Sequence, residues 1–406
     1  MSLAHSPSVV TNSMVLYYDM NNTKKSWTGQ PTINQFSIPT PDGSGNVTFP
    51  VQGTGTFQRI YSGTYGGYEI QPTDVVYKYI LGTAGCHYHG NTINVTTGQT
   101  PTWSFDYYID PSTTGYPSTN YLANMESSIG VSTGFADPTP SIIGVWKRAT
   151  VTSAAASSNG TFNAYLYPGA CSSSKLADSG FILYKNPQVE FNSFATPFVA
   201  GTRASTGAIV DLTGQNTLTA TSLTYASDNT SFSFNGSSSG VQSQSTTISF
   251  TNGASMEAIF NSADFASRAQ GILDFVGAGS QGASNYLDIY LPGNGKIRWE
   301  VIANYPNGNL GLTSYNSTAT LSNNTWYHLV CTTTTAGVGC IYINGVLDST
   351  VTFTSPVNGT ITSNIRVGVY GGQFSGKIPV AKLYNRTLLA SEVSQNFNAL
   401  RSRYGL

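Results

Sequence analysis

The acidic residues are too widely spaced along the chain to place two carboxylates side by side on one strand. Retaining glycosidases use two carboxyl groups about 5–5.5 Å apart, and alternate residues of a strand can supply such a pair because they share a face. None of the six glutamates has another carboxylate within four residues: Glu69, Glu126, Glu190, Glu257, Glu300 and Glu392. Carboxylates from different strands can still converge, so a glycan hydrolase is kept as a remote alternative. The sequence favours a protein that is not an enzyme.

The nearest approach to a metal-binding motif is the run Cys86-His87-Tyr88-His89. In a strand, His87 and His89 point to the same face, and two imidazoles at this spacing can chelate a metal if a third ligand comes from elsewhere. The alternative, which we favour, is a polar loop or strand with hydrogen-bonded imidazoles. The two histidines are therefore weak metal candidates. His328 lies in a Trp-x-His run and is expected to pack and form hydrogen bonds within a sheet.

A sugar-binding site needs an aromatic face beside hydrogen-bonding side chains. The five tryptophans lie in or beside strand signals, so most are expected in a core: Trp27, Trp103, Trp146, Trp299 and Trp326. Tyr116, Tyr121 and Tyr305 lie in apparent loops and are the better candidates for weak glycan binding. The competing interpretation is that each tyrosine packs against its own long loop.

The composition excludes several classes of partner. Charged residues make up 9% of the 406 residues, against about 25% in an ordinary soluble domain. The net charge is −1, from 18 basic and 19 acidic residues. There is no basic stripe, so neither nucleic acid nor a membrane is expected as a partner. No apolar run approaches the roughly 20 residues of a membrane span. The first residues lack a secretion signal, which predicts synthesis in a host cytoplasm.

The elements that must position these residues are almost all strands. Short alternating runs bounded by Gly, Asn, Pro or Ser predict them. Good examples are residues 14–19, 102–109, 161–167, 286–291, 296–302, 326–331 and 340–344. The last run ends in Asn344-Gly345, the strongest short signal for a hairpin turn. Regularly spaced strands with little helix predict an all-β chain of β-sandwiches.

One helix is expected, over residues 388–401 near the C-terminus. The spacing of its apolar residues predicts one buried face, made of Leu389, Val393, Phe397 and Leu400.

The four cysteines do not require a disulfide framework in a chain of this length. Cys331 and Cys340 flank a hairpin-like stretch and could lie across from each other. Because a cytoplasm is reducing, paired free thiols are expected there.

The C-terminal half resembles the laminin-G-like, concanavalin A-like lectin/glucanase sandwiches. The resemblance rests on residues 232–236 (FSFNG), 326–330 (WYHLV), 341–345 (IYING) and 374–393 (FSGKIPVAKLYNRTLLASEV). It covers roughly 200 residues and includes a late Trp-x-His strand, an Asn-Gly hairpin and a closing helix. The Glu-x-Asp-x-x-Glu motif of the family's glucanases is missing from this chain. The resemblance therefore implies a lectin-like fold without that catalytic motif.

The opening of such a sandwich is split in this chain. In similar phage proteins a strand like VLYYD is soon followed by an Asp-Leu-Ser/Thr-Gly turn. Here VLYYD occupies residues 15–19, whereas DLTG occupies residues 211–214. The simplest interpretation is an insertion into the first loop, which is tolerable because loop closure costs little extra with length. We expect one discontinuous domain of residues 1–30 and 204–406, and an inserted domain of residues 31–203.

The expected insert resembles the jelly-roll, carbohydrate-binding-module-like domains of phage structural proteins. Residues 144–150 (GVWKRAT) look like their Trp-x-Arg strand, and residues 180–203 look like their closing strand and exit peptide. That exit peptide reads PQVE, then ATPF, then GTR. It is typical of virion and tail-associated proteins, so the resemblance implies a viral origin.

Calcium is the only cofactor that the resemblance leaves possible. Some sandwiches of this family carry a Ca²⁺ site at the rim, and hard cations bind carboxylate and carbonyl oxygens. Asp19, Asp211 and Asp348 are weak candidates. A turn or cap role is the favoured interpretation of all three.

The sequence thus predicts a non-catalytic virion structural protein: a capsid decoration protein, a head fibre or a tail-associated appendage. Its expected partners are other virion proteins, with weak binding of host surface polysaccharide and formation of a homo-oligomer both possible. A bacterial cell-surface lectin or adhesin is the alternative.

Overall fold

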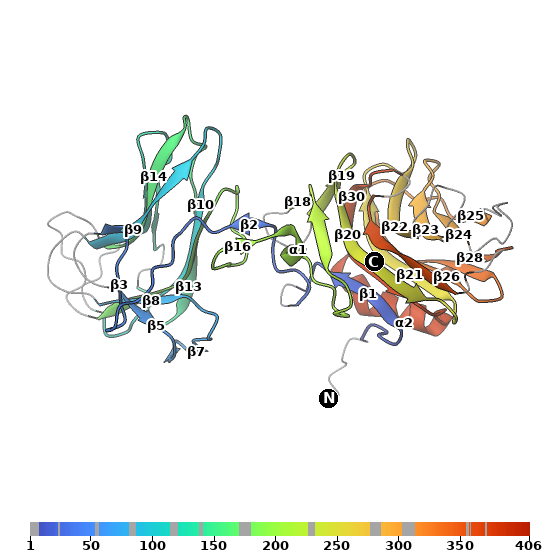
Figure 1. Cartoon of the computed structure of the whole chain (residues 1–406), viewed down its shortest axis with the longest axis horizontal. Coiled ribbons are helices and arrows are strands. Elements are labelled where there is room, and N and C mark those ends of the chain that lie inside the picture. The colour runs from blue at the N-terminus through green and yellow to red at the C-terminus, as the bar shows by residue number, and fades with distance from the viewer. Residues whose placement is uncertain are drawn as a thin grey trace. The chain divides into compact units, whose positions relative to one another are not determined.

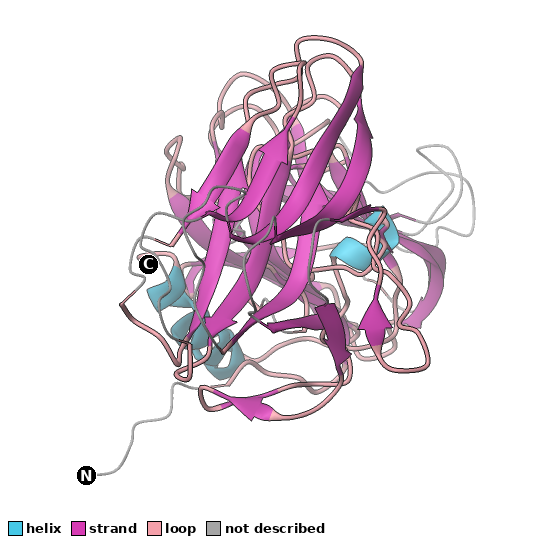
Figure 2. Ribbon diagram, turned by 90° about the vertical axis from the view of Figure 1, so that its left-hand side faces the viewer, coloured by secondary structure: helices cyan, strands magenta, loops and turns pink. Residues whose placement is uncertain are grey.

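The computed structural model of the chain describes residues 8–22, 25–52, 57–80, 87–113, 121–137, 141–169, 180–225, 232–276, 286–302, 313–354, 357, 359–369 and 372–406. Strands dominate these ranges (Figure 2). The helices described are α1 (Ser205–Ala208), α2 (Ala390–Leu400) and the 3-10 turn η1 (Arg401–Arg403). No helix in these ranges is long and apolar enough to cross a membrane. The predicted all-β class with a short C-terminal helix is confirmed.

The chain divides into two compact units. Unit 1 consists of Met1–Gln30 and Ala204–Leu406, and unit 2 consists of Pro31–Arg203. Both units are built from antiparallel sheets.

Unit 1 is a sandwich of two sheets. The eight-stranded sheet has the order β18-β19-β30-β21-β26-β27-β28, and β1 also pairs with β30. Its strands are β1 (Met14–Asp19), β18 (Thr224–Tyr225), β19 (Phe232–Asn235), β21 (Ala254–Ser262), β26 (Trp326–Thr333), β27 (Val338–Ile343), β28 (Val346–Thr352) and β30 (Ser375–Tyr384). The seven-stranded sheet has the order β17-β20-β29-β22-β23-β24-β25. Its strands are β17 (Leu218–Thr221), β20 (Gly240–Ser249), β22 (Gln270–Val276), β23 (Tyr286–Leu291), β24 (Arg298–Ile302), β25 (Thr313–Asn316) and β29 (Thr360–Val367).

The first strand of unit 1 pairs with one of its last. Strand β1 runs antiparallel to β30, with Tyr18 opposite Ala381 and Asp19 opposite Val380. In Figure 1 the blue strand β1 lies beside strands from the C-terminal part of the chain. The strand therefore belongs to unit 1, although all of unit 2 separates it in sequence from its partners.

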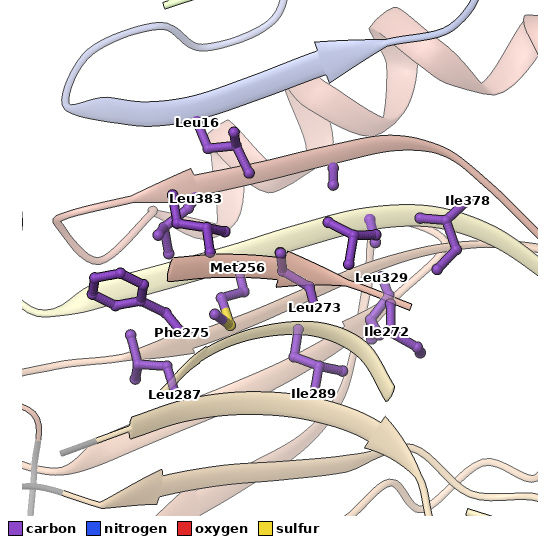
Figure 3. Packing of buried hydrophobic residues seen from close by; sticks show 14 of the residues in the cluster. Leu16, Met256, Ile272, Leu273, Phe275, Leu287, Ile289, Leu329, Ile378 and Leu383 are labelled. Atoms are coloured by element: carbon purple, nitrogen blue, oxygen red, sulfur yellow. The ribbon is translucent and has the colours of Figure 1, made fainter. Parts of the chain in front are cut away.

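The two sheets of unit 1 enclose one hydrophobic core. In β23, Leu287 and Ile289 are fully buried against it, whereas the alternate residues Asp288 and Tyr290 lie on the other face of the sheet. This alternation follows from the two-residue period of a strand. Figure 3 shows side chains of both sheets and of β1, such as Leu16, meeting in this core.

A fully buried polar network attaches helix α2 to the outer face of the eight-stranded sheet. Glu257 lies at its centre and binds Lys382 Nζ at 2.6 Å, His328 Nε2 at 3.1 Å and Asn396 Nδ2 of α2 at 2.6 Å. The N–H of Val10 donates to Asn396 Oδ1 at 2.7 Å, so the segment before β1 joins the same network. His328 packs and hydrogen-bonds within a sheet, as predicted.

The buried face of α2 differs at two positions from the predicted face, because Phe397 is only half-buried and Leu389 is exposed. Val393 and Leu400 are fully buried, but Leu389 is 66% exposed. The helix begins at Ala390, so Leu389 lies before its first turn and escapes the helical period. Leu388 is buried instead.

The predicted Asn-Gly hairpin joins β27 to β28. Asn344 and Gly345 have φ angles of 52° and 77°, as a two-residue hairpin turn requires. A Cβ atom on Gly345 would lie 2.7 Å from the ring of Phe397 on α2. The turn therefore also needs glycine for its close contact with the helix.

The two described cysteines are free and lie on opposite faces of one hairpin. Cys331 of β26 is opposite Ile341, and Cys340 of β27 is opposite Thr332. Cys331 points into the core between the sheets, whereas Cys340 packs on the side of α2. The prediction that these thiols could lie across from each other is wrong, because their positions differ by one residue in register.

Unit 2 is a second sandwich. Its six-stranded sheet has the order β13-β10-β15-β8-β5-β3, and its five-stranded sheet has the order β12-β11-β14-β9-β4. The first contains β3 (Asn46–Val47), β5 (Phe57–Ile60), β8 (Val76–Ile80), β10 (Thr102–Ile109), β13 (Trp146–Thr152) and β15 (Phe181–Glu190). The second contains β4 (Val51–Gln52), β9 (His87–Val95), β11 (Tyr121–Glu126), β12 (Thr133–Ala136) and β14 (Gly160–Gly169). Two short pairs complete the unit: β2 (Thr32–Ile33) with β16 (Thr202–Arg203), and β6 (Thr64–Tyr65) with β7 (Tyr68–Glu69).

The exit peptide of unit 2 is held by a buried hydrogen-bond network. Glu190 accepts bonds from the N–H and the hydroxyl of Thr196, at 2.7 and 2.8 Å. Gln188 accepts from the N–H of Val199 at 2.8 Å, and Arg203 donates to the carbonyl of Phe198 at 3.3 Å. The polar residues of the PQVE, ATPF and GTR runs therefore bind one another.

Candidate functional site

Three carboxylates lie next to one another on the outer face of the seven-stranded sheet. Asp274 of β22 is opposite Asp288 of β23, and Asp288 is opposite Glu300 of β24. We call these three residues the carboxylate row. Residues directly opposite on antiparallel strands have Cβ atoms about 4.5–5.5 Å apart. The strand period turns all three away from the core, because their neighbours in sequence face inward.

Polar residues extend the carboxylate row on both sides. Gln242 of β20 is opposite Arg366 of β29, which in turn is opposite Asp274. On the other side, Glu300 is opposite Ser314 of β25. A continuous line of polar side chains therefore crosses the outer face of this sheet.

The two outer carboxylates each bind a cation. Asp274 Oδ1 accepts a bond from Arg366 Nε at 2.6 Å. Glu300 Oε1 accepts from the Tyr290 hydroxyl at 3.0 Å and lies 3.8 Å from Arg298 Nη1. Burial and the nearby Glu300 raise the pKa of Tyr290 to about 12, so the phenol stays protonated and donates. Both ends of the carboxylate row are thus electrostatically balanced.

The middle carboxyl group has no such partner. Asp288 is 1% exposed, and its Oδ1 accepts no hydrogen bond within the part of the chain that the structure describes. Burial raises its pKa well above the ordinary value for an aspartate, and the charges of Asp274 and Glu300 raise it further, whereas Arg366 lowers it. Burial and the two neighbouring charges therefore favour the protonated form of Asp288.

An acid beside a carboxylate is the pair that a retaining glycosidase uses. The burial of the three carboxyl groups does not suit hydrolysis. Asp274 and Asp288 are 1% exposed and Glu300 is 6% exposed. A general acid must lie within hydrogen-bonding reach of its substrate. In this arrangement the carboxylates orient other groups, and the half-exposed Arg366, Arg298 and Tyr290 form the accessible surface.

Unit 2 carries a second polar surface, on the outer face of its six-stranded sheet. Lys185 Nζ lies 3.8 Å from the ring centre of Tyr68 and 5.2 Å from that of Trp146. Asp106 binds Lys185 at 3.4 Å and Arg148 at 3.1 Å. The lysine covers aromatic faces that a sugar ring would need, so these side chains bind mainly one another.

The three tyrosines predicted to bind glycan lie wholly or in part outside what the structure describes. Tyr116 and Tyr305 lie outside the described residues. Tyr121 begins strand β11, and its side chain also lies outside what is described. Their glycan-binding role stays a prediction.

The tryptophans divide between the two cores and the surface. Trp27, Trp103 and Trp299 are fully buried, as predicted for most of the five. Trp146 and Trp326 are half-buried.

The two histidine candidates lie in strand β9. His89 is buried, and its ring packs against Phe57, Tyr79 and Phe49 with ring centres 5.0, 6.0 and 6.1 Å apart. His87 begins the strand, and its side chain lies outside what is described. The described histidine thus belongs to an aromatic core.

The three calcium candidates are far apart in the sequence, and each binds donors within unit 1. Asp19 forms an ion pair with Arg403 at 2.6 Å. Asp211 accepts the N–H of Tyr17 at 2.9 Å, and Asp348 accepts two backbone N–H groups at 2.6 and 2.8 Å. Within the described ranges, no group of three or more His, Cys, Asp or Glu side chains could hold a metal ion. Calcium binding by these aspartates stays a prediction.

The carboxylate row cannot be recognised within any single strand of the sequence. Asp274, Asp288 and Glu300 are separated by more than ten residues each and meet only through sheet register. One signal was present: the runs YLDIYL and RWEVI each place one acidic residue between inward-facing apolar residues.

Unit 1 has the two-sheet fold of the concanavalin A-like β-sandwiches. Residues 235–394 match the family model described as the concanavalin A-like lectin/glucanases superfamily. The matched range includes the whole carboxylate row. No curated protein sequence matches the chain.

Solved structures with similar folds include receptor- and ligand-binding domains of toxins. The botulinum neurotoxin serotype G binding domain has 17% identity and a TM-score of 0.38, with 47% of this chain and 48% of that chain covered. The binding domain of Paraclostridial Mosquitocidal Protein 1 has 16% identity and a TM-score of 0.38, covering 47% and 49%. The botulinum neurotoxin serotype D ligand-binding domain, in complex with N-acetylneuraminic acid, has 14% identity and a TM-score of 0.38, covering 48% and 49%. The chain spans about half the length of each.

Proposed function

We propose that the chain is a non-catalytic structural protein on the surface of a virus particle, and that unit 1 binds host surface polysaccharide weakly through the outer face of its seven-stranded sheet. The observation that carries the glycan part is the line of polar side chains centred on the carboxylate row. It lies in the segment that matches the lectin/glucanase model. The particle could carry the protein as a capsid decoration, a head fibre or a tail-associated appendage.

The buried carboxylates support glycan binding by fixing the groups above them. Glu300 holds Tyr290 and Arg298, and Asp274 holds Arg366. Donors that are held before the ligand arrives lose less entropy on binding. Tyr290 also offers an aromatic ring beside these donors, which is the combination that a sugar ring needs. From Gln242 to Ser314 the line crosses six strands, which at the usual strand spacing is about 24 Å. A polysaccharide of several units fits that length.

The burial of the carboxylate row supports a binding role over hydrolysis. A glycan that contacts Arg298, Arg366 and Tyr290 does not reach Asp288, which is 1% exposed. Hydrolysis remains the second candidate function because the row has the acid–carboxylate chemistry of a glycosidase.

The proposed virion role is supported by the exit peptide of unit 2. The sequence of this peptide resembles the exit peptides of virion proteins, and its PQVE, ATPF and GTR runs are held together by hydrogen bonds. On a particle, many copies would increase the overall avidity of weak single contacts, because each bound copy raises the effective concentration of the others. Other virion proteins would be its partners, and a homo-oligomer would fit the same role. A bacterial surface adhesin is the alternative.

The glycan part is tested by binding to host surface polysaccharide. We expect the multivalent protein to be retained and Tyr290→Ala to weaken retention about tenfold, because one aromatic and hydrogen-bonding contact is lost. Tyr116→Ala, Tyr121→Ala and Tyr305→Ala test the loop tyrosines in the same assay. Tyr61→Ala is the matched control, since Tyr61 is a 63% exposed tyrosine of unit 2.

Three outcomes would change the proposal. Equal retention of Tyr290→Ala and Tyr61→Ala would remove the sheet face as the site. No retention of the wild-type protein would leave only the structural role. New reducing ends in the polysaccharide would show hydrolysis.

The virion part is tested by mass spectrometry of purified particles. We expect the chain in the particles, in numbers that match capsid subunits for a decoration protein or in a few copies for a tail appendage. Recovery only in the cell-surface fraction of a bacterium would support the adhesin instead.

A further inference from the structure

Asp288, the middle residue of the carboxylate row, is a buried acidic group between two other carboxylates. Among the described residues, the acidic groups facing Asp288 are Asp274 from β22 and Glu300 from β24, and each is opposite it in register. The described cations of the row bind the outer carboxylates: Arg366 of β29 binds Asp274, and Arg298 of β24 lies beside Glu300. Tyr290, on the same strand as Asp288, donates to Glu300.

An ionised Asp288 would be a buried anion between two others. Burial of an unpaired charge is costly, and a carboxyl group in this position normally keeps its proton. Two carboxylates that share a site show the same effect, because one of them stays protonated. A protonated Asp288 has a donor that can point toward a carboxylate on either adjoining strand.

We propose that the carboxylate row is a proton-operated lock on the seven-stranded sheet of unit 1. With a proton on Asp288, the carboxyl group links β23 to β22 or β24, and the row carries two negative charges balanced by two arginines. Loss of the proton adds a third, unbalanced charge and loosens β22, β23 and β24. This proposal does not depend on glycan binding.

The sign of the pH dependence follows from the shift at Asp288. Its pKa is higher in the folded chain than in the unfolded chain, so folding favours proton uptake. The free energy of unfolding is unaffected while both states are protonated. It falls as the pH rises above the ordinary aspartate value of about 4, and levels off once the pH passes the folded pKa. The lock is therefore closed in acid and weakened at higher pH.

The test is the melting temperature of unit 1 in the full chain between pH 5 and pH 9. The wild type is expected to lose on the order of 5 °C across this range. Asp288→Asn should lose much less, because a neutral amide replaces the acid at every pH. Asp274→Asn is the matched control on the next strand. It should lower the melting temperature at pH 5, where Asp288→Asn does not, because it breaks the ion pair with Arg366.

A spectroscopic measurement tests the proton directly and needs no stable variant. The wild-type infrared spectrum at pH 7 should contain the carbonyl band of a protonated carboxylic acid, and the band should decrease as the pH rises and strand order is lost. Parallel melting curves for the wild type and Asp288→Asn would overturn the proposal. So would an infrared spectrum at pH 7 without a protonated carboxyl band.

Discussion

Glu257→Gln is expected to lower the free energy of unfolding of unit 1 by about 3–5 kcal/mol, the usual cost of breaking a buried ion pair from one side. Glu257 and Lys382 are both fully buried, with 2.6 Å between Oε1 and Nζ. A glutamine leaves the ammonium group without a counter-charge. It also places an amide group near the Asn396 Nδ2 donor. We expect the melting temperature to fall by about 10 °C.

Glu392→Gln is the matched control, because it removes a glutamate charge from the same unit at a partly exposed site. Glu392 binds both terminal nitrogens of Arg386 at 2.7 Å. A solvent-accessible pair of this kind is expected to contribute about 1 kcal/mol or less. If Glu257→Gln costs no more than Glu392→Gln, the buried network does not anchor helix α2.

A double variant separates the unpaired charge from the loss of packing. Glu257→Gln with Lys382→Met removes both charges, and replacement of a buried pair by neutral groups is often close to neutral for stability. We expect the double variant to be more stable than Glu257→Gln alone. Equal instability would mean that the shape of the site, not its charge, is what the sheet requires.

The same pair limits the stability of unit 1 in acid. Burial by itself would raise the pKa of Glu257, but the charge of Lys382 and bonds from His328 and Lys382 lower it to about 2. The pair contributes fully above the ordinary glutamate value of about 4.3, and the contribution is lost as the pH falls toward 2. Glu257 thus favours a pH above this range, whereas the proposed lock at Asp288 favours a lower pH.

Local signals in the sequence were sufficient for the elements. The run YLDIYL alternates without exception, so the inward Leu287 and Ile289 and the outward Asp288 follow from the strand period alone. Asn344-Gly345 predicts the hairpin because Asn and Gly tolerate positive φ angles, and both residues have positive φ angles in the structure. The spacing of apolar residues does not locate the start of the helix, because Leu389 fits the helical period but precedes the first turn.

Register could not be predicted from local signals. Asp274, Asp288 and Glu300 are opposite one another only because three strands align to the residue. A shift of one residue would turn Asp288 into the core. The same dependence on register places the side chains of Cys331 and Cys340 on opposite faces of the sheet, because their positions differ by one residue. A site made across strands therefore requires the fold before it can be recognised.

A chain that lacks residues 1–20 is expected not to fold unit 1 at all. Strand β1 and the next residue bury four large side chains: Met14, Leu16, Tyr18 and Met20. Burial of each contributes about 1.5–3 kcal/mol, so the deletion removes on the order of 10 kcal/mol from the free energy of unfolding. This is comparable with the roughly 5–15 kcal/mol that stabilise a typical domain. The deletion also exposes the edge of β30 and removes the partner of Asn396 at Val10. Circular dichroism and calorimetry should show no cooperative transition for unit 1.

The contrasting deletion removes all of unit 2 and should be tolerated. Strands β2 and β16 pair Thr32 with Arg203 at the ends of this unit, which places their Cα atoms about 5.5 Å apart or less. A short glycine linker from Gln30 to Ala204 can therefore close the gap. We expect this much larger deletion to keep the cooperative transition of unit 1, because β1 stays available to β30. If the short deletion folds and the long one does not, the first strand is dispensable and unit 2 supplies stability that its own core does not explain.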